Sequence, residues 1–364
     1  MMKVLILCNH IGGLLSFRQE VVRAMIEDGH EVVISAPSSD RDDEVWALGC
    51  LLVSKGFNRR GTNPIKDLEL VLYYVRLIKR IKPDVILSYT IKPNVYGGMA
   101  SRITKVPLIA NITGLGSAVE SSGWLRYLTI ALYRIGLRQA TCLFFQNEYN
   151  RDFFYEKMFQ PRHYRLIPGS GVNLTRYLFR EYPMEGDLQF AFIGRILKEK
   201  GVEEYLYVAE AIRQEYPEAV FHVLGEFGDD YYRGVISEYS RQGIIYYHGD
   251  QKDIRPFLAQ CCCTIHPSYY PEGMSNVCLE TQATGRPVIT TDRIGCKDTV
   301  EDGVTGSVVK QRDKEELLEA VRKFISLRYT DKKQMGLNAR RRMERLFDRT
   351  IVVNAYLEEI YSII

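Results

Sequence analysis

The sequence predicts an α/β protein built from two doubly wound, Rossmann-like domains that face each other across a cleft. Strand-length apolar runs alternate with longer amphipathic segments from one end of the chain to the other. The length of 364 residues is enough for two hydrophobic cores. Polar and turn-forming residues cluster near the middle, at 168–171 and 181–187, which places a domain boundary there. Parallel strands of this kind need helices on both faces of each sheet.

The expected elements follow from these apolar runs. Strands are predicted at 3–8, 31–35, 84–89, 107–111 and 142–146, and then at 188–193, 220–224, 243–247, 264–266 and 287–291. Helices are predicted at segments that include 14–28 and 66–81, and the terminal segment 349–364 is apolar with a helical period.

Composition excludes several classes of protein. A net charge of +3, without an aromatic and basic platform, argues against nucleic-acid binding. Eight cysteines without a repeated Cys-x-x-Cys spacing, three of them at 261–263 in an apolar segment, indicate reduced core thiols in a cytosolic protein and no metal site. The Asp-x-Asp at 40–43 is expected to be a solvated turn. The chain has no apolar run of spanning length, and its short N-terminal run predicts a strand.

The segment 122–138 has a helical period and carries basic residues among large apolar ones. Arg126, Arg134 and Arg138 alternate with side chains such as Trp124 and Tyr127. Such a helix suits an anionic membrane surface. It equally suits a partly buried domain helix whose arginines extend to solvent.

Two glutamates suggest a ligand site in the second half of the chain. Glu272 and Glu280 lie eight positions apart, where a glycine-containing turn is expected to open a helix. On one helix, this spacing would let carboxylates at the mouth and on the second turn reach two parts of one ligand. Free N–H groups at the helix start would favour a phosphate. A solvated helix that happens to carry two glutamates is the alternative.

Glycines and cations follow the first strand of each expected domain. Gly12 and Gly13 would let a loop approach a ligand closely, although paired glycines are also common in simple turns. Arg195 and Lys200 follow the strand 188–193, where two cations would clamp a diphosphate without a metal unless they are merely solvated.

These motifs together resemble the retaining glycosyltransferases of family 4, which have the GT-B fold. The resemblance runs over essentially the whole chain. Its motifs are Gly194–Gly201, Pro267-Ser268, Glu272-Gly273, Leu279-Glu280 and Ala283–Val288. It implies an acceptor-side domain at 1–170, onto which 349–364 packs back, and a nucleotide-sugar-binding domain at 171–348.

The resemblance also implies roles for individual residues. Arg195 and Lys200 would bind the diphosphate and stabilise the leaving charge, Glu280 the ribose hydroxyls, and Glu272 the sugar hydroxyls. Further contacts to the sugar, phosphate or base are implied for the main chain of Gly273, Met274, Ser275 and Asn276, and for Gly12, Gly13 and Gly249. No metal or other cofactor is required, since the nucleotide sugar is the donor substrate.

One departure from the family pattern concerns the acceptor side. Thr113 stands where many members have histidine. The segments 111–116 and 88–94 are similar to a subgroup that builds bacterial polysaccharides and glycans on lipid diphosphates, often from UDP-N-acetylhexosamines or UDP-galactose. There Lys92 would meet the acceptor diphosphate. The implied location is cytoplasmic, with peripheral contact at the inner face of the plasma membrane.

Two other functions are compatible with such a fold. A GT-B UDP-sugar 2-epimerase would need acid and base groups in the cleft, and the paired Glu272 and Glu280 argue against it. A non-catalytic sugar-nucleotide-binding subunit would be expected to have lost Arg195, Lys200 or a glutamate, yet all four are present. The sugar, the acceptor and the linkage depend on first-domain loops and do not follow from the shared motifs.

Overall fold

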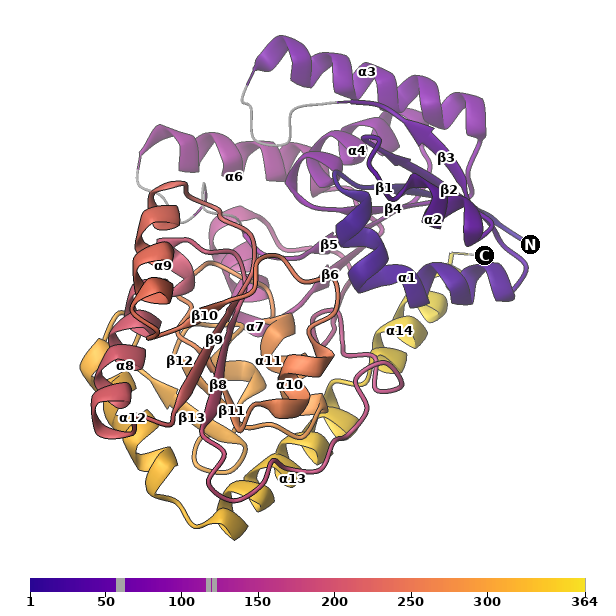
Figure 1. The fold of residues 1–364 in the computed structure, drawn as a ribbon. Coiled ribbons are helices and arrows are strands. Elements are labelled where there is room, and N and C mark those ends of the chain that lie inside the picture. The colour runs from indigo at the N-terminus through magenta and orange to yellow at the C-terminus, as the bar shows by residue number, and fades with distance from the viewer. Residues whose placement is uncertain (57–62, 116–118, 120–122, 364) are drawn as a thin grey trace. The chain divides into compact units, whose positions relative to one another are not determined.

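The computed structural model describes residues 1–56, 63–115, 119 and 123–363 (Figure 1). The chain forms two compact units. The first comprises Met1–Ser170 together with Arg349–Ile364, and the second comprises Gly171–Asp348. Each unit contains one parallel sheet with helices packed on it.

The first unit has a seven-stranded parallel sheet in the order β3-β2-β1-β4-β5-β6-β7. Its strands are β1 (Lys3–Leu7), β2 (Glu31–Ala36), β3 (Leu51–Ser54), β4 (Val85–Tyr89), β5 (Leu108–Ile112), β6 (Cys142–Phe145) and β7 (Tyr164–Leu166). The chain winds outward in one direction from β1 and in the other from β4, which is the doubly wound arrangement.

Three helices in the described part of the first unit, among them the long helix that starts at Pro64, begin after a residue whose side chain accepts from a first-turn amide. The Asn63 side chain caps α3 and Pro64 fills its first position, where a missing N–H does no harm. The helices are α1 (Ile11–Glu27), α2 (Asp42–Ala47), α3 (Pro64–Ile81), α4 (Ile91–Thr104), α6 (Trp124–Leu137), α7 (Glu148–Phe153) with a π-helical turn at Phe154–Met158, and α14 (Arg349–Tyr361).

Alternation along the strands builds two core layers in the first unit. On β1, Val4 and Ile6 are buried with side chains of α1 and α14. Leu5 and Leu7 point to the other face and are buried with side chains of α3, α4 and α6. The apolar run at the N-terminus therefore forms a strand covered on both faces, as parallel sheets require (Figure 1).

The C-terminal helix belongs to the first unit. Arg349 at its start pairs with Glu20 of α1 at 2.8 Å. Further along, the Tyr356 hydroxyl accepts a hydrogen bond of 2.7 Å from the Asn111 amide, inside the core. Helix α14 thus covers one face of a sheet whose strands come from the other end of the chain.

The second unit has a six-stranded parallel sheet in the order β10-β9-β8-β11-β12-β13. Its strands are β8 (Gln189–Ile193), β9 (Val220–Leu224), β10 (Tyr246–Tyr247), β11 (Cys263–His266), β12 (Val288–Thr291) and β13 (Gly306–Val309). Its helices are α8 (Val202–Glu215), α9 (Tyr231–Arg241), α10 (Arg255–Gln260), α11 (Asn276–Ala283), α12 (Lys314–Ser326) and α13 (Tyr329–Leu346), with 3-10 turns at Lys198–Lys200 and Lys297–Thr299.

The second core repeats the alternation of the first. Phe190 and Phe192 of β8 are buried in a cluster with side chains of α8, α9 and α12. Ala191 and Ile193 are buried on the other face with side chains of α10, α11 and α13. All eight cysteines of the chain are buried free thiols, in agreement with the prediction of reduced core residues.

Three strands were not predicted from the sequence. They are β3, β7 and β13, and each forms the edge of its sheet. Edge strands are short and pack on fewer neighbours, so their sequences lack the continuous apolar run that marks a central strand. The predicted strand at 243–247 also shrinks to Tyr246–Tyr247, again at an edge.

Candidate active site

The strand order of the second unit identifies the place for a ligand. Winding changes direction between β8 and β11, which pair side by side. Ligands of doubly wound sheets bind beyond the carboxyl ends of such neighbouring strands. The two segments that leave this edge are 194–201 after β8 and 267–275 after β11. They contain Arg195, Lys200, Glu272 and Gly273–Ser275, about half of the predicted site residues.

The two segments are packed directly on each other. The Tyr269 amide donates a hydrogen bond of 2.9 Å to the Glu199 carbonyl. Gly201 has a φ of +77°, and a Cβ there would lie 2.3 Å from the carbonyl oxygen of Pro267. Only glycine allows this conformation and this approach. Gly201 of the first motif therefore allows Pro267 of the second motif to pack closely against it.

Lys200 and Glu272 form an ion pair across these segments. Their side chains are only 12% and 15% exposed, respectively. Burial lowers the pKa of the Lys200 ammonium from 10.5 to about 8, so the group is still charged at neutral pH. Two of the residues predicted to act on the donor are thus held together.

Tyr270 lies beneath both predicted cations. The Arg195 guanidinium carbon is 5.3 Å from the centre of its ring, and the Lys200 nitrogen is 5.2 Å from it. An aromatic face attracts cations through its quadrupole. Tyr270 therefore helps to place two positive charges side by side. The sequence prediction missed it, although its place between Ser268 and Glu272 in the motif was a usable signal.

The two glutamates do not share a helix, which corrects the sequence prediction. Helix α11 begins at Asn276 with Ser275 as its N-cap, so Glu272 lies in the preceding loop. Glu280 is half-buried on α11 itself. The eight-residue spacing crosses a loop and about one helical turn instead of two turns. The predicted glycine-containing turn is present as a bend at Gly273-Met274, directly before the N-cap Ser275.

Two contacts of Ser275 hold the start of α11 in place. The Ser275 amide donates to the Gly295 carbonyl at 2.7 Å, and its hydroxyl lies 3.1 Å from Nε2 of the buried His266. Burial, assisted by the charge of Lys200, lowers the pKa of His266 to about 3, so this ring is neutral. Met274 packs into the core.

These contacts reduce the number of main-chain amides at 273–276 that are able to donate a hydrogen bond to a ligand. The Ser275 amide has a protein acceptor, so its predicted contact to a ligand is not supported by this arrangement. Two side-chain atoms nearby, Nδ1 of His266 and Oδ1 of Asn276, are buried and have no hydrogen-bond partner in the structure. Such orphaned atoms need an explanation, and they mark the loop before α11 as a place for a polar ligand.

Gly249 follows the edge strand β10 in a left-handed conformation, with a φ of +70°. Its carbonyl accepts a hydrogen bond of 2.8 Å from the Gly225 amide, which joins the ends of β9 and β10. The adjacent His248 lies 2.9 Å from His222, ring nitrogen to ring nitrogen. His248 also lines a surface hollow together with Phe227, among other residues.

Gly12 and Gly13 are not in a loop, contrary to the prediction. Helix α1 begins at Ile11, so both glycines lie in its first turn. The Gly13 amide donates to Nδ1 of His10 at 3.0 Å, and a Cβ at Gly12 would lie 3.0 Å from the same ring. His10 caps this helix, which accounts for its position without a ligand.

The other two predicted residues of the first unit follow neighbouring strands. Thr113 comes directly after β5 and is half-buried. Lys92 lies in the first turn of α4, after β4, and pairs with Asp67 of α3 at 2.7 Å. Their side chains are 14% and 15% exposed, so Lys92 already has a counter-charge within the fold.

Comparison with known proteins agrees with this arrangement. A family model described as "Glycosyl transferases group 1" matches residues 177–342, and one described as "Glycosyl transferase 4-like domain" matches 12–169. Together these two models cover most of the chain. The protein belongs to the family 4-type glycosyltransferases of the GT-B fold.

Similar proteins include enzymes of bacterial glycan assembly. One is the N,N'-diacetylbacillosaminyl-diphospho-undecaprenol alpha-1,3-N-acetylgalactosaminyltransferase of Campylobacter jejuni, 25% identical over 371 residues and 96% of each chain. Another is the UDP-Gal:alpha-D-GlcNAc-diphosphoundecaprenol alpha-1,3-galactosyltransferase of Escherichia coli, 26% identical over 76% of this chain and 74% of its own. Anabaena HepE, solved with UDP and glucose, shares the fold at a TM-score of 0.81 and 18% identity over the full length of both chains.

The sequence of this glycosyltransferase allowed helix α6 to be a membrane-surface helix or a partly buried domain helix. The structure shows features of both. Thr129, Tyr133 and Leu137 are buried, whereas Trp124 and Tyr127 are 71% and 74% exposed. Among the residues described, no helix combines the length and apolar character that crossing a membrane would need. The helix is therefore a domain helix that also presents large aromatic side chains to its surroundings.

Proposed function

We propose that this glycosyltransferase moves a hexose or N-acetylhexosamine from a UDP-sugar to a lipid-diphosphate-linked sugar, with retention of the anomeric configuration. The observation that carries the donor half is the cluster of Arg195, Lys200 and Glu272 over Tyr270. It lies beyond adjacent strands where the sheet changes winding direction, which is where a nucleotide is expected.

The chemistry explains why cations are needed at this place. Breaking the bond to the anomeric carbon leaves a nucleotide diphosphate with a growing negative charge and an oxocarbenium-like sugar. Arg195 and Lys200 would stabilise the leaving group from fixed, largely desolvated positions, without reorganisation at the moment of reaction. Two cations beside one another supply the charge that a metal supplies elsewhere, so we propose a metal-independent reaction.

The ion pair suggests how donor binding prepares the site. In the structure Glu272 is the counter-ion of Lys200. An arriving diphosphate would replace the carboxylate as the partner of Lys200, because its negative charge would neutralise both Lys200 and the half-buried Arg195. Glu272 would then be released to accept hydrogen bonds from sugar hydroxyls. Glu280, half-buried on α11, would hold the ribose, and the segment around Gly249 would lie by the base.

The acceptor half of the proposal is supported by the similar proteins. The names of both enzymes given above specify a diphospho-undecaprenol acceptor, and the Escherichia coli name specifies a UDP-sugar donor. Both names also specify an alpha linkage; since UDP-hexoses of this kind are alpha anomers, such a product means retention. In the first unit, Thr113 and Lys92 follow β5 and β4, at the carboxyl edge where the acceptor would bind.

A surface of the first unit fits a membrane-linked acceptor. Helices α3 and α6 both pack against α4 (Figure 1). Ile65, Leu68 and Leu72 are exposed along α3, as are Trp124 and Tyr127 on α6. Exposed basic residues accompany them, namely Arg76, Lys79, Arg80, Arg134 and Arg138. We propose that this surface rests on the anionic headgroups of the inner leaflet, in the manner of an interfacial amphipathic helix.

The test is nucleotide release from a panel of UDP-, GDP- and ADP-sugars, measured in EDTA, with and without a prenyl-diphosphate-linked sugar. Release that needs both a UDP-sugar and the lipid-linked acceptor is expected, and NMR of the product should show an alpha anomer. An isomerised sugar without acceptor would indicate the 2-epimerase instead. Tight UDP-sugar binding without any turnover would indicate the binding subunit.

A further inference from the structure

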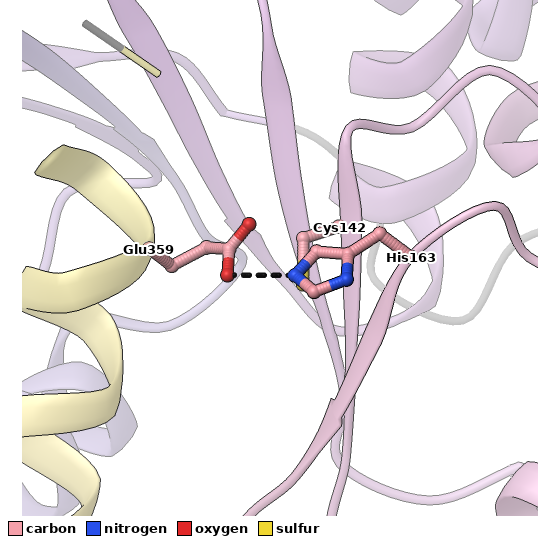
Figure 2. Close-up of side chains that lie close together, drawn as sticks. All are labelled: Cys142, His163 and Glu359. Carbon is pink, nitrogen blue, oxygen red and sulfur yellow. Dashed lines mark hydrogen bonds and ion pairs between the residues drawn. The ribbon is translucent and has the colours of Figure 1, made fainter. Parts of the chain in front are cut away.

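Three side chains with metal-ligating atoms lie close together in the first unit, at the amino-terminal ends of the sheet's strands. Cys142 is the first residue of β6, His163 directly precedes β7, and Glu359 lies on α14. Figure 2 shows the three pointing toward one another from these separate elements. Their ligand atoms, one from each residue, all lie within 4.8 Å of one another.

The geometry of this cluster is close to that of a coordination site. His163 Nε2 is 3.0 Å from Glu359 Oε2 (Figure 2). A tetrahedral zinc with bonds of about 2.0–2.3 Å requires its ligand atoms to be about 3.3–3.7 Å apart. The limit of 4.8 Å on all three separations is about 1 Å above the range that zinc needs.

Two side chains of the cluster are buried and the third is exposed, an arrangement that favours the binding of an ion from solvent. Cys142 and Glu359 are buried, and the Glu359 side chain is only 4% exposed. The buried carboxylate is hydrogen-bonded by the Cys142 thiol and by an imidazole that is 54% exposed, and neither supplies a full counter-charge. The exposed side of His163 leaves an entry path and room for a water. The nearby Arg165 guanidinium is occupied by Glu358, at 2.6 Å, and by the Ala355 carbonyl.

The ligand set distinguishes among cations. Thiolate, imidazole and one carboxylate together are typical ligands of zinc, whereas calcium and magnesium prefer all-oxygen sites. A second group of such residues, His266, Glu272 and Cys296, exists in the second unit. There Glu272 is already paired with the Lys200 ammonium, whose charge repels a cation.

We propose that Cys142, His163 and Glu359 bind one zinc ion, with a water as the fourth ligand. The ion takes the place of the Cys142 thiol proton, which leaves to solvent, and the neutral imidazole and the carboxylate complete the protein ligands. Two anionic ligands balance the charge of the ion. The site joins the C-terminal helix to two strands of the first sheet, so its role is structural, and it revises the expectation of a protein without metal. It does not depend on the proposed function.

Binding is tested with the full-length chain, stripped with EDTA and titrated with ZnCl2 against a chromophoric chelator. One ion per chain is expected, and Cys142→Ser and Glu359→Gln should each weaken its binding by about 100-fold or more. Cys50→Ser, at a buried free thiol of the same unit, is the matched control and should change nothing. With Co2+, a thiolate charge-transfer band should appear in the wild type and in Cys50→Ser, and be lost in Cys142→Ser.

A second measurement covers variants that fold poorly. His163→Gln changes a half-exposed side chain, so the chain should fold and lose the ion. Zinc should raise the melting temperature of the wild type, EDTA should reverse the rise, and neither should affect His163→Gln. Zinc binding that survives all three ligand substitutions, or that is lost only in Cys296→Ser, would overturn the proposal. So would the absence of binding, which would leave His163 and Glu359 as a plain ion pair.

Discussion

Lys200 and Glu272 form a largely buried ion pair between the segments that follow β8 and β11. The two residues are 72 positions apart in the chain, and each belongs to a different motif of the family. Their contact makes the two motifs one electrostatic unit, since removing either residue would leave the other as an unpaired, largely buried charge.

Removing the Lys200 charge should impair the chemical step. Lys200→Ala is expected to lower kcat/KM by about 100- to 1000-fold, the usual effect of losing one fixed group that stabilises transition-state charge. Lys198→Ala is the control, because Lys198 lies in the same 3-10 turn with a side chain that is 65% exposed. Equal losses in the two variants, measured as nucleotide release, would contradict a specific role for Lys200.

The alkaline side of the pH profile should report Lys200. Burial lowers its pKa from 10.5 to about 8, so its positive charge is lost as the pH rises through 8. We expect kcat/KM to fall above about pH 8, and Lys200→Arg to move that fall to higher pH.

The same shift has the opposite effect on stability. Between about pH 8 and 10.5 the unfolded chain binds this proton more tightly than the folded one, so the contribution of Lys200 to stability rises with pH. A fall in activity that instead tracks a loss of folded protein, followed by circular dichroism, would point to unfolding and not to Lys200.

Neutralising Glu272 should change UDP binding and catalytic turnover in opposite directions. Glu272→Gln removes the counter-ion of Lys200, so the site becomes more positive and UDP should bind a few-fold more tightly, about 1 kcal/mol. Turnover should fall, because the carboxylate no longer accepts from the sugar. Calorimetry with UDP measures the first effect and nucleotide release the second. Glu199→Gln, at an exposed carboxylate next to Lys200 in the chain, should leave both unchanged.

The hydroxyl of Tyr356 should stabilise the docking of α14. Tyr356→Phe removes the acceptor of the buried Asn111 amide and should lower the free energy of unfolding by about 1–3 kcal/mol. Tyr361→Phe removes a solvent-exposed hydrogen bond to Asp28 from the same helix and should cost less, about 0.5 kcal/mol. Chemical denaturation of both variants compares the two, and equal effects would mean that the buried bond contributes nothing specific.

Membrane contact should depend on the aromatic side chains of α6. Replacing Trp124 and Tyr127 by alanine is expected to reduce sedimentation with vesicles that contain anionic lipid, because both side chains are more than two-thirds exposed. Trp46→Ala removes a tryptophan that is 57% exposed on α2 and should leave sedimentation unchanged. Binding that persists in the double variant would exclude α6 as the contact.

The fold class, the central strands and the family could all be predicted from the sequence. Strands such as β1 and β8 are nearly continuous apolar runs because they are buried on both faces, and that pattern can be read without coordinates. The motif around Arg195 and Lys200 was likewise visible, because its residue types and spacing are local. Edge strands were missed because fewer neighbours constrain their composition.

Which of the predicted site residues contact one another depends on the tertiary structure and could not be predicted. The sequence placed Glu272 and Glu280 on one helix, but Ser275 caps α11 three residues after Glu272 and leaves that carboxylate in the loop, facing Lys200. Tyr270 beneath the two cations, and the convergence of Cys142, His163 and Glu359, join residues from separate segments. Spacing along a chain predicts contacts only within one helix or strand. Contacts between loops depend on how the sheet brings strand ends together, and no local pattern records that.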